Sequence, residues 1–103
     1  MTRHRPPQPS FARALKLVRT AIGVPQEAFD QVSSRTHISA LERAIKSPTL
    51  TKVDQLASVM GVHPLTLLAL TYCAGQEASE VARLLERARE ETATILSAKH
   101  AAQ

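Results

Sequence analysis

The sequence predicts an all-α fold, and three observations favour it. Hydrophobic residues make up 44% of the chain, but only three residues are aromatic: two phenylalanines and one tyrosine. A core built from Leu, Val, Ile and Ala suits helices better than strands, which favour β-branched and aromatic side chains. Apolar residues also recur every three or four positions, as on one face of a helix. The 103 residues give room for one domain and an appendage.

The first helix is expected to follow a short N-terminal segment. Residues 1–9, MTRHRPPQP, contain three prolines and no apolar period, so they are expected to form a flexible basic arm. Ser10 can cap a helix that ends at Gly23, where a left-handed C-cap fits. The apolar residues of this helix are Phe11, Leu15, Val18 and Ile22.

Two more helices are expected before residue 45. Pro25 suits the first turn of a helix that runs to about Val32. Its inward residues are expected to be Ala28, Phe29 and Val32. The stretch SSRTHISALER, residues 33–43, predicts a third helix from Arg35 to about Ala44, capped by Ser34. One face of this helix is almost entirely hydrogen-bonding groups, and the other consists of Ile38, Leu41 and Ile45.

A fourth and a fifth helix complete the predicted unit, residues 10–73. Pro48 closes the preceding loop, and Thr49 can cap a helix that ends at Gly61. This fourth helix carries Leu50, Val53, Leu56, Ala57 and Met60. His63 and Pro64 fit the cap and first position of a fifth helix. It is expected to run to about Tyr72 through Leu65, Leu67, Leu68 and Leu70.

Residues 76–103 form a tail rich in good helix formers. Val81, Ala88 and Ile95 recur every seven residues, which predicts a long amphipathic helix. Leu84, Leu85 and Leu96 lie beside them. We expect these six residues to form an oligomerisation surface. The seam is only two to three heptads long, so the alternative is that the tail folds back on helices one and five of its own chain.

Four segments in order resemble one known family. They are GVPQEAF before the second helix, ISALER in the third, SPTLTKVDQLASVMGV after it, and HPLTLL at the start of the fifth. Together, residues 11–72 resemble the DNA-binding domain of the Cro/CI-type (XRE) regulators, a family of phage repressors and small bacterial transcription factors. The resemblance implies a five-helix lambda-repressor-like DNA-binding domain, here followed by an additional long C-terminal helix.

The sequence departs from the family pattern at two places. Gln26 and Ile38 are twelve positions apart, two fewer than is usual in the family, so the turn between the second and third helices is shorter. Ala44 stands where the family typically has glycine. We expect the third helix to continue through Ala44, because a left-handed conformation is costly for a residue other than glycine.

The resemblance implies that the third helix enters the major groove of DNA. Arg35 can then contact guanine O6 and N7 together. Thr36, His37 and Ser39 can bond a base edge or a phosphate, and the methyl group of Ala40 can meet a thymine methyl. The alternative is that these side chains are only solvated, and that His37 packs beside the cap at Ser34.

Other polar residues are expected to hold the DNA backbone or the fold. Gln26 occupies the family's phosphate-binding position, and Arg19 with Glu42 the positions of a structural salt bridge. Further phosphate contacts are expected from Arg43, Lys46, Lys52, Arg3 and Arg5. Residues 1–73 hold nine lysines and arginines against four acids, and residues 74–103 hold four against five, so the excess of positive charge lies where a polyanion would bind.

The function expected is sequence-specific regulation of transcription by a repressor or dual regulator that binds double-stranded DNA as a homodimer or higher homo-oligomer. Two alternatives stay open: an antitoxin that binds a partner protein and represses its own operon, and a protein-interaction module on the same fold. No catalytic set, metal-ligand spacing or cofactor motif is evident, and the lone Cys73 reads as a small buried side chain. No membrane segment is expected, so the location expected is cytoplasmic and nucleoid-associated.

Overall fold

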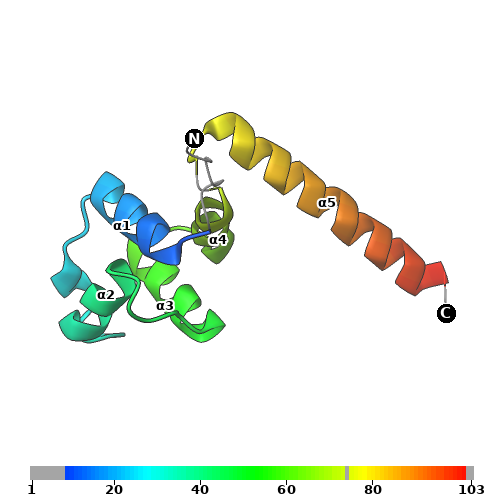
Figure 1. The fold of residues 1–103 in the computed structure, drawn as a ribbon. Helices are drawn as coiled ribbons and strands as arrows, with labels where there is room; N and C mark the ends of the chain where they lie inside the picture. The colour runs from blue at the N-terminus through cyan, green and yellow to red at the C-terminus, as the bar shows by residue number, and fades with distance from the viewer. Residues whose placement is uncertain (1–8, 74, 102–103) are drawn as a thin grey trace.

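The computed structural model describes residues 9–73 and 75–101, and all regular structure within these ranges is helical. The all-α prediction is therefore confirmed. Four α-helices and one 3-10 turn pack together, and a long fifth α-helix extends from them (Figure 1). In chain order the elements are α1 (Phe11–Ile22), η1 (Gln26–Phe29), α2 (Arg35–Glu42), α3 (Leu50–Met60), α4 (Pro64–Tyr72) and α5 (Ala78–Ala101).

Side-chain caps begin four of the five α-helices, as the sequence predicts. Ser10 Oγ accepts a hydrogen bond from the backbone N–H of Arg13 at the start of α1. Corresponding caps begin the next three helices, and the cap residues are Ser34, Thr49 and His63. Gly23 and Gly61 end α1 and α3 in the left-handed conformation, with φ angles of 83° and 72°. The polar and glycine residues at helix ends thus set most of the boundaries.

The predicted second helix is wrong in type and length. Residues 26–29 form one 3-10 turn, and the chain then bends through residues 30–33 to the cap of α2. Phe29 is completely buried, but Ala28 is exposed instead of facing inward, and Val32 is only partly buried. Residues 26–33 lie between Pro25 and the cap of α2, and the 3-10 turn occupies only the first four of them.

The predicted end of α2 is also wrong. The helix ends at Glu42, and Ala44 adopts a left-handed conformation with a φ of 60°. The backbone N–H of Ile45 donates to the carbonyl of Ala40 at 2.9 Å, which satisfies a carbonyl at the helix end. Ile45, expected to face the core, is 59% exposed. The helix end thus takes the geometry that a glycine would adopt without strain.

The core lies where α1, η1, α2, α3 and α4 meet. Every one of these elements contributes at least one completely buried residue. The largest are Leu15, Phe29, Ile38, Leu41, Leu56 and Leu67. Leu50, at the start of α3, lies outside this core and is exposed. Each Å² of apolar surface buried contributes about 25 cal/mol to the free energy of folding. This cluster is therefore the main source of stability.

Helix α5 is arranged differently from the other helices. Among the described elements it contacts α4 alone, and none of its residues is fully buried. Its C-terminal end lies far from α1–α4 (Figure 1). The alternative that the tail folds back on the first and fifth predicted helices is therefore found only in part, because α5 contacts the fifth predicted helix, α4, but not α1.

Among the described residues, no single helix has both the length and the apolar character that a membrane span requires. Helices α3 and α4 meet those requirements only as a pair, and the pair is bent by 110°. The described residues also contain no group of three or more His, Cys, Asp or Glu side chains placed to hold a metal ion.

The strained backbone at Ala44 predicts that Ala44→Gly stabilises the protein. A left-handed conformation costs about 1 kcal/mol or more for a residue with a Cβ, and part of this gain is lost to the freer unfolded chain. We expect the free energy of unfolding in urea to rise by about 0.5–1 kcal/mol. Gly61→Ala is the matched control, because it introduces the same strain and should lower that free energy. A loss of stability in Ala44→Gly would show that this residue is not left-handed in solution.

Candidate nucleic-acid interface

Helix α2 has one buried face and one polar face. Ile38 and Leu41 are completely buried in the core, and they hold the helix in place. Arg35 and Thr36 are exposed at its N-terminal end. Because the apolar residues anchor only one side, the other side is presented to solvent along the length of the helix.

The polar face of α2 continues to the C-terminal end of the helix. Residues three or four positions apart are neighbours on a helix surface, so Thr36, Ala40 and Arg43 form one row. Ala40 and the adjacent Ser39 are partly exposed, and Arg43 is exposed. An α-helix is about 10–12 Å across with its side chains, which matches the major groove of B-DNA, about 12 Å wide.

His37 lies at the edge of this face. Its backbone N–H donates to Ser34 Oγ at 3.1 Å and so forms the N-cap of α2. The cap thus uses the main chain of His37, while the residue as a whole is partly buried.

Arg35 has one weak partner within the described chain. Its Nη2 lies 3.6 Å from Glu27 Oε1, and the two side chains are 62% and 52% exposed. An exposed ion pair of this kind contributes little free energy, typically 0–1 kcal/mol. The guanidinium is therefore available to a stronger acceptor.

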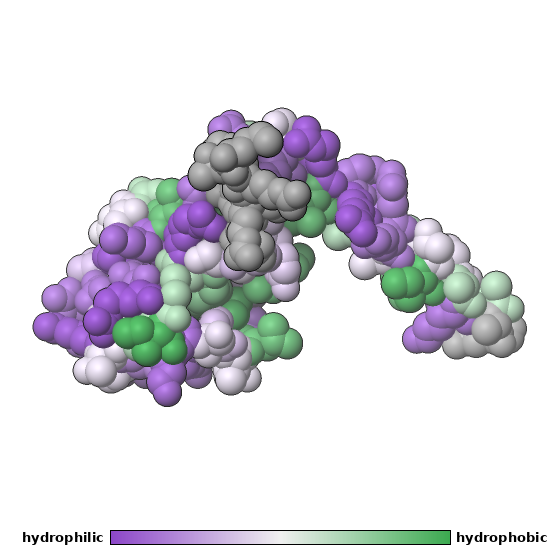
Figure 2. Space-filling view, in the orientation of Figure 1, coloured by the Kyte–Doolittle hydropathy of each residue, from purple (hydrophilic) through white to green (hydrophobic). Residues whose placement is uncertain are grey.

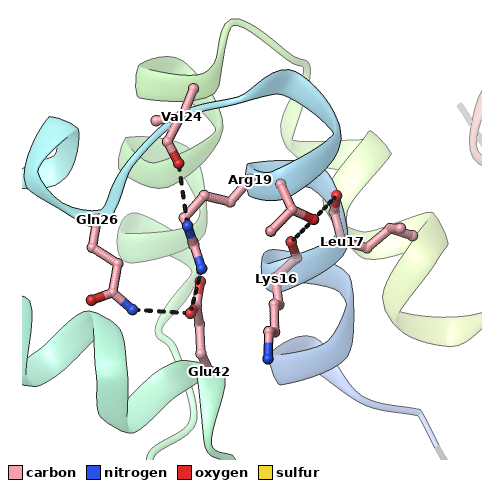
Figure 3. A network of polar contacts seen from close by, with 7 residues as sticks. Lys16, Leu17, Arg19, Val24, Gln26 and Glu42 are labelled. Atoms are coloured by element: carbon pink, nitrogen blue, oxygen red, sulfur yellow. Dashed lines mark hydrogen bonds and ion pairs between the residues drawn. The ribbon is translucent and has the colours of Figure 1, made fainter.

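A buried ion pair joins α1 to α2. Arg19 Nε donates to Glu42 Oε2 at 2.5 Å and Arg19 Nη2 to Glu42 Oε1 at 3.0 Å, so the contact has two parallel hydrogen bonds (Figure 3). The side chains are only 15% and 7% exposed. The hydrogen bond to Glu42 raises the pKa of the Arg19 guanidinium above its ordinary value, so the guanidinium stays charged. This is the ion pair that the family resemblance implied.

The same network includes the loop between α1 and η1. Arg19 Nη1 donates to the carbonyl of Val24 at 3.3 Å, and Gln26 Nε2 donates to Glu42 Oε1 at 3.1 Å (Figure 3). Gln26 was expected at the N-terminus of an α-helix, with its amide turned to a phosphate. The structure has a single 3-10 turn there and an amide that contacts Glu42.

Lys52 ties α3 to the turn before α2. Its ammonium group donates a hydrogen bond to the carbonyl of Val32, and the residue is partly buried. Together with Arg19 and Glu42, this contact holds the segment before α2 from both sides.

Comparison with known proteins places this geometry in a family. A helix-turn-helix family model of the Cro/CI (XRE) type matches residues 9–67, more than half of the chain. The chain belongs to this helix-turn-helix family. Comparisons with curated proteins and with solved structures gave no significant match.

Membership indicates what the helix-turn-helix does at the family level. Helix-turn-helix proteins of this type are DNA-binding regulators and are generally not enzymes. The second helix of the motif is the one that lies in the major groove. In this helix-turn-helix protein the element at that position is α2, which follows the single turn η1.

Sequence reasoning missed two basic residues beside the helix-turn-helix. Arg13 and Lys16 on α1 line a hollow of about 480 Å³ with Arg43 and Ala44 at the end of α2. A smaller hollow of about 170 Å³, lined in part by Ala44 and Lys46, lies beside it. Arg13 and Lys16 are three residues apart, and this spacing shows that they share a face of α1. It does not show that this face adjoins the end of α2, which depends on how the helices pack.

The remaining predicted residues are distributed as follows. Lys46 is exposed in the loop after α2. Arg3 and Arg5 lie outside the described residues. On α5, Val81 and Leu84 are partly buried, and Val81 lines a hollow together with residues of α4. The exposed members of the expected oligomerisation surface are Leu85, Ala88, Ile95 and Leu96.

The buried ion pair predicts a large effect for Glu42→Ala. This change leaves Arg19 charged, buried and without its carboxylate, so the free energy of unfolding should fall by about 3 kcal/mol. The double variant Arg19→Met with Glu42→Met removes both charges and should lose less than Glu42→Ala alone. Asp54→Ala removes an exposed acid of α3 and should change the value by less than about 0.5 kcal/mol. Denaturant unfolding measures all three, and equal effects of Glu42→Ala and Asp54→Ala would contradict a buried pair.

Proposed function

We propose that this helix-turn-helix protein is a sequence-specific transcriptional regulator, a repressor or dual regulator, that binds operator DNA as a dimer through α2 in the major groove. The observation that carries the proposal is the polar face of α2. It is exposed, while Ile38 and Leu41 and the pair of Arg19 with Glu42 fix the helix from behind. A rigid helix that presents hydrogen-bonding groups is what the reading of base edges needs.

Each side chain on that face is assigned a contact with DNA. Arg35 contacts guanine O6 and N7, in exchange for its weak pair with Glu27. Thr36 and Ser39 bond base edges or phosphates, and the methyl group of Ala40 packs on a thymine methyl. His37, at the edge of the face, reaches a phosphate or a base edge.

A second group of residues positions the protein on the DNA backbone. Arg43 and Lys46 follow the end of α2, and the hollow beside them adds Arg13 and Lys16 of α1. Lys52 can keep its bond to Val32 and still offer a phosphate two further N–H groups. Gln26 can keep its bond to Glu42 and offer a phosphate its second amide N–H group, and Arg3 and Arg5 complete the proposed backbone contacts. Each phosphate neutralised releases counterions, so affinity should fall steeply with added salt.

Dimerisation supplies the specificity that one α2 helix lacks. One helix contacts about 4–5 base pairs, and proteins of this architecture commonly bind two inverted half-sites. The exposed residues of α5 offer the surface for this contact, because α5 is a 24-residue helix with no buried residue of its own.

The proposal predicts that Arg35→Ala weakens and broadens DNA recognition. Loss of a bidentate contact to guanine removes about 1–3 kcal/mol of discrimination, so affinity for a selected operator should fall about tenfold or more and the preference at one base pair should relax. Fluorescence anisotropy on matched and single-substituted duplexes measures both.

Arg87→Ala is the matched control for this experiment, since Arg87 is an exposed arginine of α5 that pairs with Glu91. It should leave both affinity and preference unchanged. If Arg35→Ala binds as the wild type does, with an intact circular dichroism spectrum, then α2 is not the reading helix.

The dimer is tested by the molar mass of the full chain. Light scattering at micromolar concentration should give twice the chain mass of 11.2 kDa. Ile95→Glu places a charge on the exposed far half of α5 and should shift the mass toward that of a single chain. A monomeric mass for the wild type would refute the dimer.

An antitoxin remains the second candidate, because the exposed surface of α5 also suits a different protein. DNA binding would then autoregulate an operon, and α5 or residues 1–9 would neutralise a toxin. This function would be favoured over simple homodimerisation if a small protein copurifies with the wild-type chain and binds the Ile95→Glu variant more weakly.

A further inference from the structure

The near half of α5 and helix α4 together form an apolar groove. The groove has a volume of about 230 Å³, and five of its six lining residues are apolar: Leu65, Thr66, Ala69, Leu70, Val81 and Leu85. Leu65 is 59% exposed and Leu85 is 48% exposed. The groove is therefore a partly open surface that a further apolar side chain could fill.

The far half of α5 carries the complementary feature. Ile95 and Leu96 are adjacent in sequence and are 65% and 53% exposed. Figure 2 shows hydrophobic surface near α4 and again toward the C-terminal end of α5, with hydrophilic surface between them. Ile95 lies ten positions beyond Leu85, about 15 Å along the helix. A continuous helix cannot bend back over that distance, so these residues cannot fill the groove of their own chain.

The charges of α5 favour one orientation of a second copy. Glu77 immediately precedes the helix and Glu80 lies in its first turn, so this end is acidic on balance even with Arg83 in the second turn, while Lys99 and His100 lie in the last turn. A parallel pair of α5 helices would bring acids to acids and bases to bases. An antiparallel pair brings the acidic start of each helix to the basic end of the other and also aligns the two helix dipoles favourably.

We propose that two copies of this chain pair through antiparallel α5 helices, and that Ile95 of each copy fills the α4–α5 groove of the other while Leu96 packs beside the groove. This inference rests on the dimer of the proposed function and adds its arrangement. The register that seats Ile95 against Leu85 also seats Leu96 against Leu84 and Ala88 against Thr92. At these positions large apolar residues meet large ones, and small residues meet near the twofold axis, while the alkyl stem of Lys99 packs on Val81.

The ion pairs within α5 are consistent with this seam. Arg87 pairs with Glu91, and Arg89 pairs with Glu86. These contacts satisfy four charges within one helix, so these four charged side chains need no partner from the second copy.

The antiparallel pairing also determines where the two DNA-binding units lie. It places the two helix-turn-helix units at opposite ends of the paired helices, which are each about 36 Å long, whereas parallel pairing would place both units at one end.

Cysteine cross-linking of the full chain tests the arrangement. Leu85→Cys and Ile95→Cys are each made in a Cys73→Ala background, and one of the two proteins carries a size tag. We expect a disulfide to form readily when the two proteins are mixed and oxidised. We expect it to form poorly when either protein is oxidised alone. A disulfide requires Cα atoms about 4.4–6.8 Å apart, so it reports which residues face each other. Leu84→Cys with Leu96→Cys is a second pair, in case one substitution weakens the dimer. Light scattering under reducing conditions first establishes the mass of each variant.

The outcomes separate this inference from the dimer itself. Mixed disulfides at either pair support the antiparallel arrangement. Disulfides of each variant with itself, in place of mixed ones, show a parallel pair and overturn the inference while the dimer stands. A dimeric mass without any disulfide places the contact elsewhere and overturns the inference as well. A monomeric wild type overturns both.

Discussion

The orientation of α2 depends on the ion pair between Arg19 and Glu42. The element before α2 is only one 3-10 turn, so it provides less packing surface than a full helix. The bidentate contact to α1 and the hydrogen bond from Gln26 fix the C-terminal end of α2. Ile38 and Leu41 fix its middle. Because the two side chains are only 15% and 7% exposed, removing one partner leaves a largely buried charge, and this penalty opposes any other orientation of the helix.

A second constraint follows from the way α2 ends. The left-handed Ala44 turns the chain away at once, so the helix has only eight residues and its polar row ends at Arg43. The turn also places Ala44 beside the start of α1, where Arg13 and Lys16 add positive charge. A strained residue thus shapes both the length of the proposed reading helix and the basic surface that flanks it. Retention of strain at a proposed binding surface is consistent with a functional role for that geometry.

The sequence was sufficient for features that depend on local chemistry. Ser10, Ser34, Thr49 and the pair His63 and Pro64 begin helices, and Gly23 and Gly61 end them, because each residue satisfies or terminates the backbone at its own position. The sequence was insufficient for features that depend on how the whole chain packs. The shortened turn was visible as a count of residues, but not that a 3-10 turn would replace a helix. At Ala44 intrinsic preference favoured continuation, yet packing imposed a left-handed residue and exposed Ile45. The basic hollow between α1 and α2 required the packed structure, since its residues are far apart in sequence.

The central claim is that two copies of α2, each held by its ion pair, read DNA together. Selection of bound duplexes from a random pool tests this claim most directly, because half-site sequence and symmetry are reported in one experiment. We expect enrichment of two short half-sites in inverted order, each about 4–5 base pairs long and containing a guanine for Arg35. A pool that remains random at low salt would contradict it. Enrichment of a single unrepeated half-site would contradict the dimer.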